Sequence, residues 1–283
     1  MPATRLRLPC MRDVTDRFLR TPDGLDLHLV DFGGDEGPPL LFVHGSFAHA
    51  RVWDFLVAQL PPSRRALALD LPGHGDSSRA SAEERYAFAR VVDDLSAVVS
   101  ELQGKPVLVG HSLGSAVAMQ YAASRPETLA AAIFMDIDPC PPELQAKHLN
   151  EVGAEPPKIY ASLDRAVARE SRIAPAASPA VHMHLARHGY RLTDAGYAQK
   201  FDQAFLRSVR TWDTRALLPN ITVPALALRG GESIVMSEQG YRDLLEGLPN
   251  ARGEVVFGAT HQLHLDRPLA VATLIEGFVS GLG

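Results

Sequence analysis

The sequence predicts an α/β fold with a mostly parallel central sheet, flanking helices and an inserted helical cap. Two patterns predict it. Short apolar runs bounded by Gly and Pro alternate with helix-length segments, and one long stretch, residues 139–215, interrupts this alternation. The length agrees, because 283 residues of which 46% are hydrophobic can bury a large core. We expect residues 1–138 and 216–283 to form the core and residues 139–215 to form the cap.

The strand pattern begins at residues 25–32, where apolar and polar residues alternate as in a half-buried antiparallel strand. Six further runs are short and mostly apolar, which is typical of parallel strands covered on both faces. These runs are residues 39–43, 66–69, 106–109, 130–135, 225–228 and 253–257. The helix-length segments between them are residues 52–60, 86–102, 115–124, 237–246 and 269–279.

The predicted cap contains no convincing strand. Its helical pieces are residues 142–151, 164–171, 179–187 and 195–207, and Pro, Gly and Ser separate them. A helical insertion of this kind is expected to lie over the ends of the core strands.

Composition and charge argue against several classes of binding partner. The net charge of −5 and the lack of a basic stripe argue against a nucleic-acid or anionic-membrane binder. The mean hydropathy is −0.03, and no apolar run approaches the ~20 residues of a membrane span. Cys10 and Cys140 match no metal-binding or redox spacing. Residues 1–20 are rich in arginine, but the apolar segment of a signal peptide does not follow them. We expect a cytoplasmic protein with free thiols and a small-molecule partner.

The strongest motif is Gly110-His111-Ser112-Leu113-Gly114, a G-x-S-x-G pattern. It directly follows the apolar run 106–109 and opens the predicted helix 115–124. A strand, a sharp turn and a helix are the setting of a nucleophile elbow, in which the serine hydroxyl is exposed at the helix N-terminus. The motif therefore predicts Ser112 as a nucleophile.

A serine hydroxyl needs a base, and two histidines near the C-terminus could serve. His261 follows the last predicted strand most directly, in the loop Gly258-Ala259-Thr260-His261. His264 lies three residues later, in a segment that leads toward a helix. We expect His261 to be the base and His264 to pack beside it.

The base needs a carboxylate that orients it and stabilises the imidazolium, and three acids compete for this role. Asp136 and Asp138 follow the predicted strand 130–135, and Glu232 is the acid in the turn after the strand 225–228. Asp136 ranks first because it lies at the strand end. Glu232 and Asp138 remain open alternatives.

The developing oxyanion needs two backbone N–H donors. One belongs to the residue after the nucleophile, Leu113. The other is expected from the loop after residues 40–43, where Ser46 is the first candidate and Phe47 the second. His44 lies in the same loop, and we expect it to be a structural hydrogen bonder.

Together these residues resemble the α/β-hydrolase superfamily from about Asp23 to the C-terminus. The landmarks are the pair 44–45 (HG), the segment 70–77 (DLPGHGDS), the elbow 110–114 and His261 followed by Asp266 and Pro268. The resemblance implies the α/β-hydrolase fold and a hydrolase without a metal or an organic cofactor. Ser112 separates the chain from haloalkane dehalogenases and epoxide hydrolases, which carry a carboxylate at the elbow.

Within this superfamily, the turn 230–233 (GGES) resembles a subgroup of small-molecule esterases and thioesterases. In that subgroup the turn replaces the usual aspartate, and the acid follows the earlier strand in an Asp-Ile-x-Pro context. Residues 136–139 (DIDP) fit this pattern. The resemblance therefore implies that Asp136 is the acid.

Several aromatic residues are candidates for the substrate pocket, because caps of this kind usually border it. They are Phe47 and Trp53 beside the oxyanion loop and Phe201, Phe205 and Trp212 in the cap. The alternative is that they only pack the cap onto the core. His182, His184 and His188 could be mistaken for a metal site, but they lack a carboxylate or cysteine that completes the set, and we expect no metal there.

The predicted activity is cleavage of carboxylic esters or thioesters of small molecules by a Ser-His-Asp triad through an acyl-enzyme. The same residues would also serve a C–C bond hydrolase, a lactonase or a cofactor-free perhydrolase. A ligand receptor without catalysis is the remaining alternative, which the complete set of candidate residues disfavours.

Overall fold

The computed structural model describes residues 11–208 and 212–282, and its main feature is an eight-stranded sheet. The strand order is β1-β2-β4-β3-β5-β6-β10-β11, with β1–β2 and β2–β4 antiparallel and the remaining pairs parallel. The bounds are β1 (Thr15–Arg20), β2 (Asp26–Asp31), β3 (Glu36–Val43), β4 (Arg64–Leu69), β5 (Val107–His111), β6 (Ala131–Met135), β10 (Ala225–Gly230) and β11 (Ala251–Val256). The predicted mostly parallel central sheet flanked by helices is confirmed.

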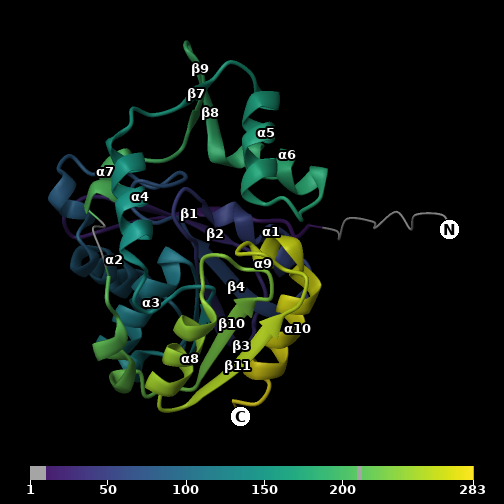
Figure 1. Ribbon diagram of the computed structural model, residues 1–283. Coiled ribbons are helices and arrows are strands. Elements are labelled where there is room, and N and C mark those ends of the chain that lie inside the picture. Colours follow the sequence, from purple (N-terminus) through teal and green to yellow (C-terminus); the bar gives the residue numbers. More distant parts are fainter. Residues whose placement is uncertain (1–10, 209–211, 283) are drawn as a thin grey trace.

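Helices cover both faces of the sheet (Figure 1). One face carries α2 (Phe88–Ser100), α3 (Leu113–Ser124) and α8 (Glu238–Gly247), and the other carries η1 (Ala50–Trp53), α1 (Asp54–Val57), α9 (Leu263–Asp266) and α10 (Pro268–Val279). Successive strand residues point to opposite faces. Thus Leu41 and Val43 pack on the first face, whereas Leu40 and Phe42 pack on the second. This alternation produces two apolar layers that hold the carboxyl ends of the parallel strands in place.

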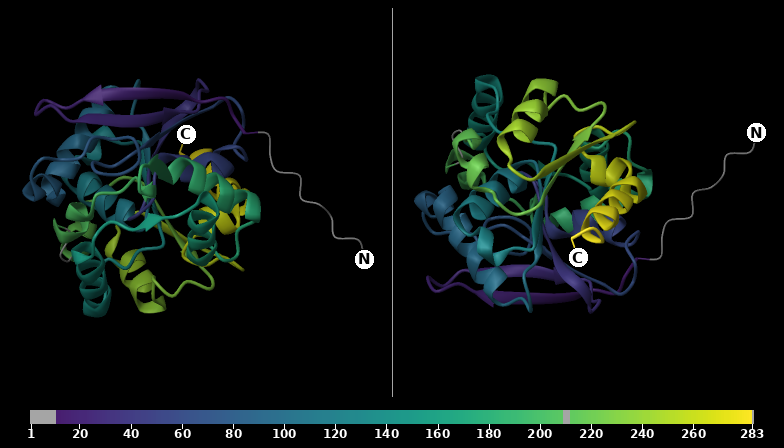
Figure 2. Two further views of the ribbon diagram at one scale, coloured as in Figure 1. Left: turned by 90° about the horizontal axis from the view of Figure 1, so that it is seen from above. Right: turned by 90° about the horizontal axis from the view of Figure 1, so that it is seen from below.

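A hairpin of the exposed strand β1 and the largely buried strand β2 forms one edge of the sheet, and Figure 2 shows both strands in purple in both views. The antiparallel strand predicted at residues 25–32 is confirmed as β2, but β1 was not predicted. At the opposite edge, β11 pairs only with β10, and Phe257 beyond its end is 84% exposed. The expectation that residues 253–257 are covered on both faces is therefore wrong, because this strand is at the edge.

The long insertion follows β6 and lies over the sheet in Figure 1. It contains α4 (Glu143–Ala154), α5 (Leu163–Ile173), α6 (Pro179–Gly189) and α7 (Gln203–Ser208). It also contains a three-stranded antiparallel sheet of β7 (Ile159–Tyr160), β8 (Tyr190–Thr193) and β9 (Gly196–Gln199). The expectation of a strand-free insertion is wrong, and of the helix predicted at 195–207 only residues 203–207 are helical. Residues 194–195 form the tight β8–β9 turn, Gly196 begins β9 with φ 123°, and α7 starts only after this strand.

The remaining helical turns are short: η2 (Glu83–Tyr86), η3 (Pro126–Thr128) and η4 (Arg215–Asn220). No helix in the described ranges has the length and apolar character needed to cross a bilayer. Cys10 lies outside the described residues, and Cys140 is a partly buried free thiol. The core and cap boundaries at residues 138 and 215 stay predictions.

Buried histidines make the stability of this fold pH-dependent. Burial lowers the pKa of His49, His74 and His264 to about 3, while the aspartates beside His28 raise its pKa despite desolvation. Below about pH 6.5 the unfolded chain thus binds more protons at the first three sites than the folded chain does, so acid favours unfolding. We expect the free energy of unfolding to fall between pH 7 and pH 5 by on the order of 1–2 kcal/mol per buried neutral histidine, partly offset by His28.

Urea unfolding at pH 7, 6 and 5 and constant ionic strength measures this dependence. His148 is exposed on α4, so His148→Gln, which removes no buried group, supplies the control for replacement of a histidine. A free energy of unfolding that stays constant or rises toward pH 5 would contradict the prediction.

Candidate active site

Ser112 occupies a strained turn between β5 and α3. Its backbone has φ 53° and ψ −125°, a conformation that L-residues adopt only where the surrounding structure enforces it. The Ser112 amide donates to the carbonyl of Met135 at the end of β6, at 2.9 Å, and so ties the turn to the neighbouring strand. The strand, the strained turn and the helix have the backbone geometry expected of the predicted nucleophile elbow, and the role of Ser112 as nucleophile stays a prediction.

The two glycines of the motif leave room for this turn. A Cβ atom on Gly110 would lie 2.5 Å from the carbonyl oxygen of Gly114. A Cβ atom on Gly114 would collide with the carbonyl oxygens of Val43 and His44. A side chain at Gly110 would therefore push α3 away from β5, and one at Gly114 would push it away from β3, and either change would displace Ser112.

Asp136 follows β6 directly and its carboxylate is fully buried at the centre of a hydrogen-bond cluster. Nδ1 of His261 lies 2.8 Å from Oδ1 of Asp136. The Ser233 hydroxyl donates to the same oxygen at 2.5 Å, and the Gly230 amide donates to Oδ2 at 2.7 Å. Three donors thus satisfy a carboxylate that has no access to water, as a buried charge requires.

The turn after β10 therefore supplies donors to Asp136. Within this turn Glu232 is exposed, and its backbone amide donates to the Ala259 carbonyl at 2.9 Å. Asp138 accepts instead from the amide and hydroxyl of Ser237 at the start of α8, both at 3.2 Å, and burial raises the pKa of Asp138. Of the three candidate acids, the structure brings only Asp136 to His261.

His111, which sequence reasoning did not single out as functional, supports the backbone of His261. Its Nε2–H donates to the His261 carbonyl at 2.8 Å, and the two rings lie 4.6 Å apart. Burial and the neighbouring His264 and His261 keep the pKa of His111 well below its ordinary value, so the ring is a neutral donor. The sequence contains one indication of this role, because His111 directly precedes Ser112 in the G-x-S-x-G motif. His264 packs on His111 at 4.5 Å between ring centroids, as expected.

The loop after β3 packs directly against Ser112. A Cβ atom on Gly45 would lie 2.9 Å from Cβ of Ser112, so only glycine allows this approach. His44 donates from Nδ1 to the Gly45 carbonyl at 2.8 Å and accepts at Nε2 from the Leu71 amide at 3.1 Å. Both of its ring nitrogens therefore brace the loop. Ser46 follows this turn and shares a cavity with Ser112.

The cavity has a volume of about 210 Å³ and is lined by Ser46, Phe47, Ser112, Trp212 and His261, together with residues of α4, α5 and α6. The candidate catalytic residues and the insertion thus enclose the same space. Phe47 and Trp212 border it, as expected for pocket residues.

Three other aromatic candidates do not lie at this cavity, so their assignment to the pocket is corrected. Trp53 is fully buried beneath the loop, with its ring 4.9 Å from Phe42. Phe201 and Phe205 pack on His74 at 4.8 and 4.6 Å and belong to the core. Their apolar rings hold the insertion on the sheet.

The histidines of α6 do not converge on one point. His182 donates from Nε2 to the Ala174 carbonyl at 2.8 Å, whereas Nε2 of His184 lies 3.1 Å from Oδ2 of Asp54. Elsewhere in the described chain, His28, Asp70 and Asp76 place ligand-type atoms within 4.8 Å of one another. There Nδ1 of His28 already donates to Asp70 at 2.7 Å, which is the bonding of a structural pair.

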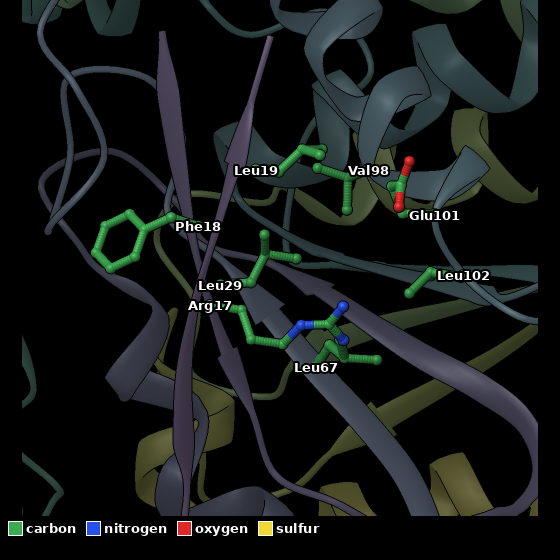
Figure 3. Close-up of a pocket in the computed structure, with 8 residues that line it drawn as sticks. All are labelled: Arg17, Phe18, Leu19, Leu29, Leu67, Val98, Glu101 and Leu102. Atoms are coloured by element: carbon green, nitrogen blue, oxygen red, sulfur yellow. The ribbon is translucent and has the colours of Figure 1, made fainter.

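A separate hollow of about 110 Å³ lies between β1, β2, β4 and α2 (Figure 3). Leu19, Leu29, Leu67 and Val98 form its apolar lining, and Arg17 and Glu101 are its charged residues. None of the candidate catalytic side chains lines it. It results from packing of the polar edge hairpin against the first helical layer.

Comparisons with known proteins identify the fold family. A family model described as alpha/beta hydrolase fold matches residues 38–268. The chain is 27% identical over 262 residues to esterase Rv0045c of Mycobacterium tuberculosis, covering 86% of this chain and 83% of that protein. It is 25% identical over 255 residues to esterase YbfF of Escherichia coli, covering 86% and 93%.

Solved structures show the same architecture. E-2-(acetamidomethylene)succinate hydrolase superposes with a TM-score of 0.85 at 22% identity, covering 95% of this chain and all of that one. The thioesterase domain from the curacin biosynthetic pathway superposes with a TM-score of 0.81 at 22% identity, covering 94% and 100%. At these identities the likeness concerns the fold.

Proposed function

The chain belongs to the alpha/beta hydrolase fold family, and from this premise we propose that it is a serine esterase of small molecules. Relatives named as esterases support a hydrolase of esterase type. The proposal adds a Ser112–His261–Asp136 triad, an acyl-enzyme and a carboxylic ester or thioester as the substrate.

In the proposed reaction, the Ser112 hydroxyl attacks the ester carbonyl while Nε2 of His261 accepts its proton. Asp136 holds Nδ1–H of His261, which leaves Nε2 free as the base, and it stabilises the imidazolium that forms. The backbone N–H groups of Leu113 and Ser46 stabilise the oxyanion. His261 then protonates the leaving alcohol, and a water that it activates releases the acid and regenerates Ser112.

The observation that carries this proposal is the cluster around Asp136. A buried carboxylate with three donors has little freedom to rotate, so it orients the His261 ring toward the cavity that Ser112 lines. The GGES turn supplies two of these donors, which explains why this turn lacks an aspartate of its own.

The cavity volume leads to an expected substrate size. A space of about 210 Å³ accommodates a short acyl chain, and longer chains would have to leave through its mouth. We therefore expect the highest kcat/KM among p-nitrophenyl esters for chains shorter than octanoate, with a decline toward decanoate.

Release of p-nitrophenol across the series from acetate to decanoate tests the proposal. Mass spectrometry after a rapid acid quench should find the acyl group on the peptide that contains Ser112. Lack of turnover of every ester, or acylation at a different residue, would contradict the proposal.

A further inference from the structure

The wall of the cavity that the insertion forms contains a buried charge cluster of Arg169, Glu170 and Tyr190. Arg169 and Glu170 lie on α5 and Tyr190 begins β8, and all three line the same cavity as Ser112 and His261. The side chains of Arg169 and Glu170 are only 16% and 9% exposed. Burying an ion pair costs desolvation free energy that an apolar pair of similar size would not incur. Packing alone therefore does not explain why charged residues occupy this wall.

The hydrogen bonds of the cluster are unevenly distributed. Oε1 of Glu170 accepts from Nη1 of Arg169 at 2.8 Å and from the Tyr190 hydroxyl at 2.6 Å. A guanidinium has five N–H donors, and in the described chain Nε and Nη2 of Arg169 have no hydrogen-bond acceptor. Glu170 is thus held by two donors while part of the Arg169 fork remains available.

Arg169 also lies close to the loop after β3, which contains the predicted oxyanion donor Ser46. Its guanidinium carbon is 5.9 Å from the centroid of the Phe47 ring, and Phe47 follows the Gly45–Ser46 turn that packs on Ser112. Burial opposes the charge of Arg169, but the attraction of Glu170 outweighs it and raises the pKa of Arg169. The cavity therefore contains a permanent cation with unused donors near the predicted oxyanion donor.

We propose that Arg169 is a specificity residue that binds a carboxylate of the substrate remote from the scissile bond. The inference rests on the proposed esterase function and narrows its substrate class to monoesters or thioesters of dicarboxylic acids. The guanidinium fork matches a carboxylate through two parallel N–H···O bonds. The small volume, bounded by Val52, Leu149 and Leu185, leaves room for a planar carboxylate on a short chain.

The first test compares two ethyl esters of nearly equal shape. Monoethyl glutarate carries a free carboxylate, and ethyl 5-methylhexanoate replaces that carboxylate with an isopropyl group. We expect the native protein to favour the glutarate ester in kcat/KM, mainly through a lower KM. In Arg169→Gln this preference should fall by about 10- to 100-fold, because hydrogen bonds to charged groups are lost.

Matched variants separate recognition from a structural role. Arg165→Gln removes the same charge from an exposed position one turn earlier on α5 and should leave the preference unchanged. Arg169→Lys keeps the charge but loses the fork, so an intermediate preference is expected. Equal kcat/KM for the two esters in the native protein, or equal losses on both esters in Arg169→Gln, would overturn the inference.

A binding measurement keeps this result separate from the proposed function. Titration calorimetry of monoethyl glutarate into Ser112→Ala should show binding that weakens by at least about 10-fold in Ser112→Ala/Arg169→Gln. If neither ester is hydrolysed but this difference holds, the esterase proposal fails and the carboxylate site stands. If esters are hydrolysed but the two variants bind alike, the esterase stands and the carboxylate site is refuted.

Discussion

Replacing Ser112 with alanine should lower kcat/KM for a p-nitrophenyl ester by about 10³- to 10⁶-fold. The variant has no hydroxyl to form the acyl-enzyme, so only the oxyanion donors and substrate binding can still accelerate attack by water. Steady-state release of p-nitrophenol at saturating and limiting ester concentrations measures the loss. The acylated Ser112 peptide should be missing from the mass spectrum of the quenched variant.

Ser124→Ala is the matched control for this change. Ser124 ends the same helix, α3, and is exposed, so its loss should leave kcat/KM within about twofold. Circular dichroism should show that both variants keep the native fold. A decrease of only a few-fold in Ser112→Ala would reject Ser112 as the nucleophile.

Replacing Asp136 with asparagine should lower kcat by about 10²- to 10⁴-fold. The amide of asparagine carries no charge to stabilise the imidazolium. The amide NH₂ group of asparagine is a donor. It would lie against either the Gly230 N–H or the donors Ser233 and His261, so one donor would face another. His261 would lose the partner that fixes its tautomer. The pH dependence of kcat distinguishes this effect from misfolding. Loss of the carboxylate alters the base and should change the shape of the profile, whereas a smaller folded fraction would lower kcat equally at every pH.

Glu232→Gln distinguishes the two turns that could supply the acid. Glu232 is exposed and its side chain makes no hydrogen bond in the described structure, so its amide variant should retain kcat within about twofold. The reverse pattern, with a large loss in Glu232→Gln and a small one in Asp136→Asn, would move the acid to the turn after β10.

The six apolar runs predict parallel strands because a strand buried on both faces has little room for polar residues, although the run 253–257 also contains Glu254 and forms the partly exposed edge strand β11. All six are strands in the structure, and their order along the chain places Ser112, Asp136 and His261 after β5, β6 and β11. Since parallel strands present their carboxyl ends at one edge, the sequence is sufficient to bring these three residues to the same region.

Other elements could not be predicted in this way, because their own sequences contain no apolar run. The sequence of β1, TDRFLR, is polar and mostly exposed, and β7 has only two residues. Their pairing depends on partners distant in sequence rather than on their own composition. The pair Arg169–Glu170 was missed for a similar reason, because charged residues on a helix ordinarily face water. A sign was nevertheless present, since Glu170 follows buried Ala166 by four residues and so lies on the same helix face.

The donors to the Asp136 carboxylate have a consequence for synthesis of the chain. Gly230, Ser233 and His261 follow Asp136 by 94, 97 and 125 residues. A growing polypeptide emerges from the ribosome N-terminal end first, so the Ser112 elbow can fold long before these partners exist. On the proposed mechanism, hydrolysis begins only once translation has passed His261 and the last strand has docked. The proposed mechanism therefore gives the growing chain no hydrolytic activity until this late stage of its synthesis.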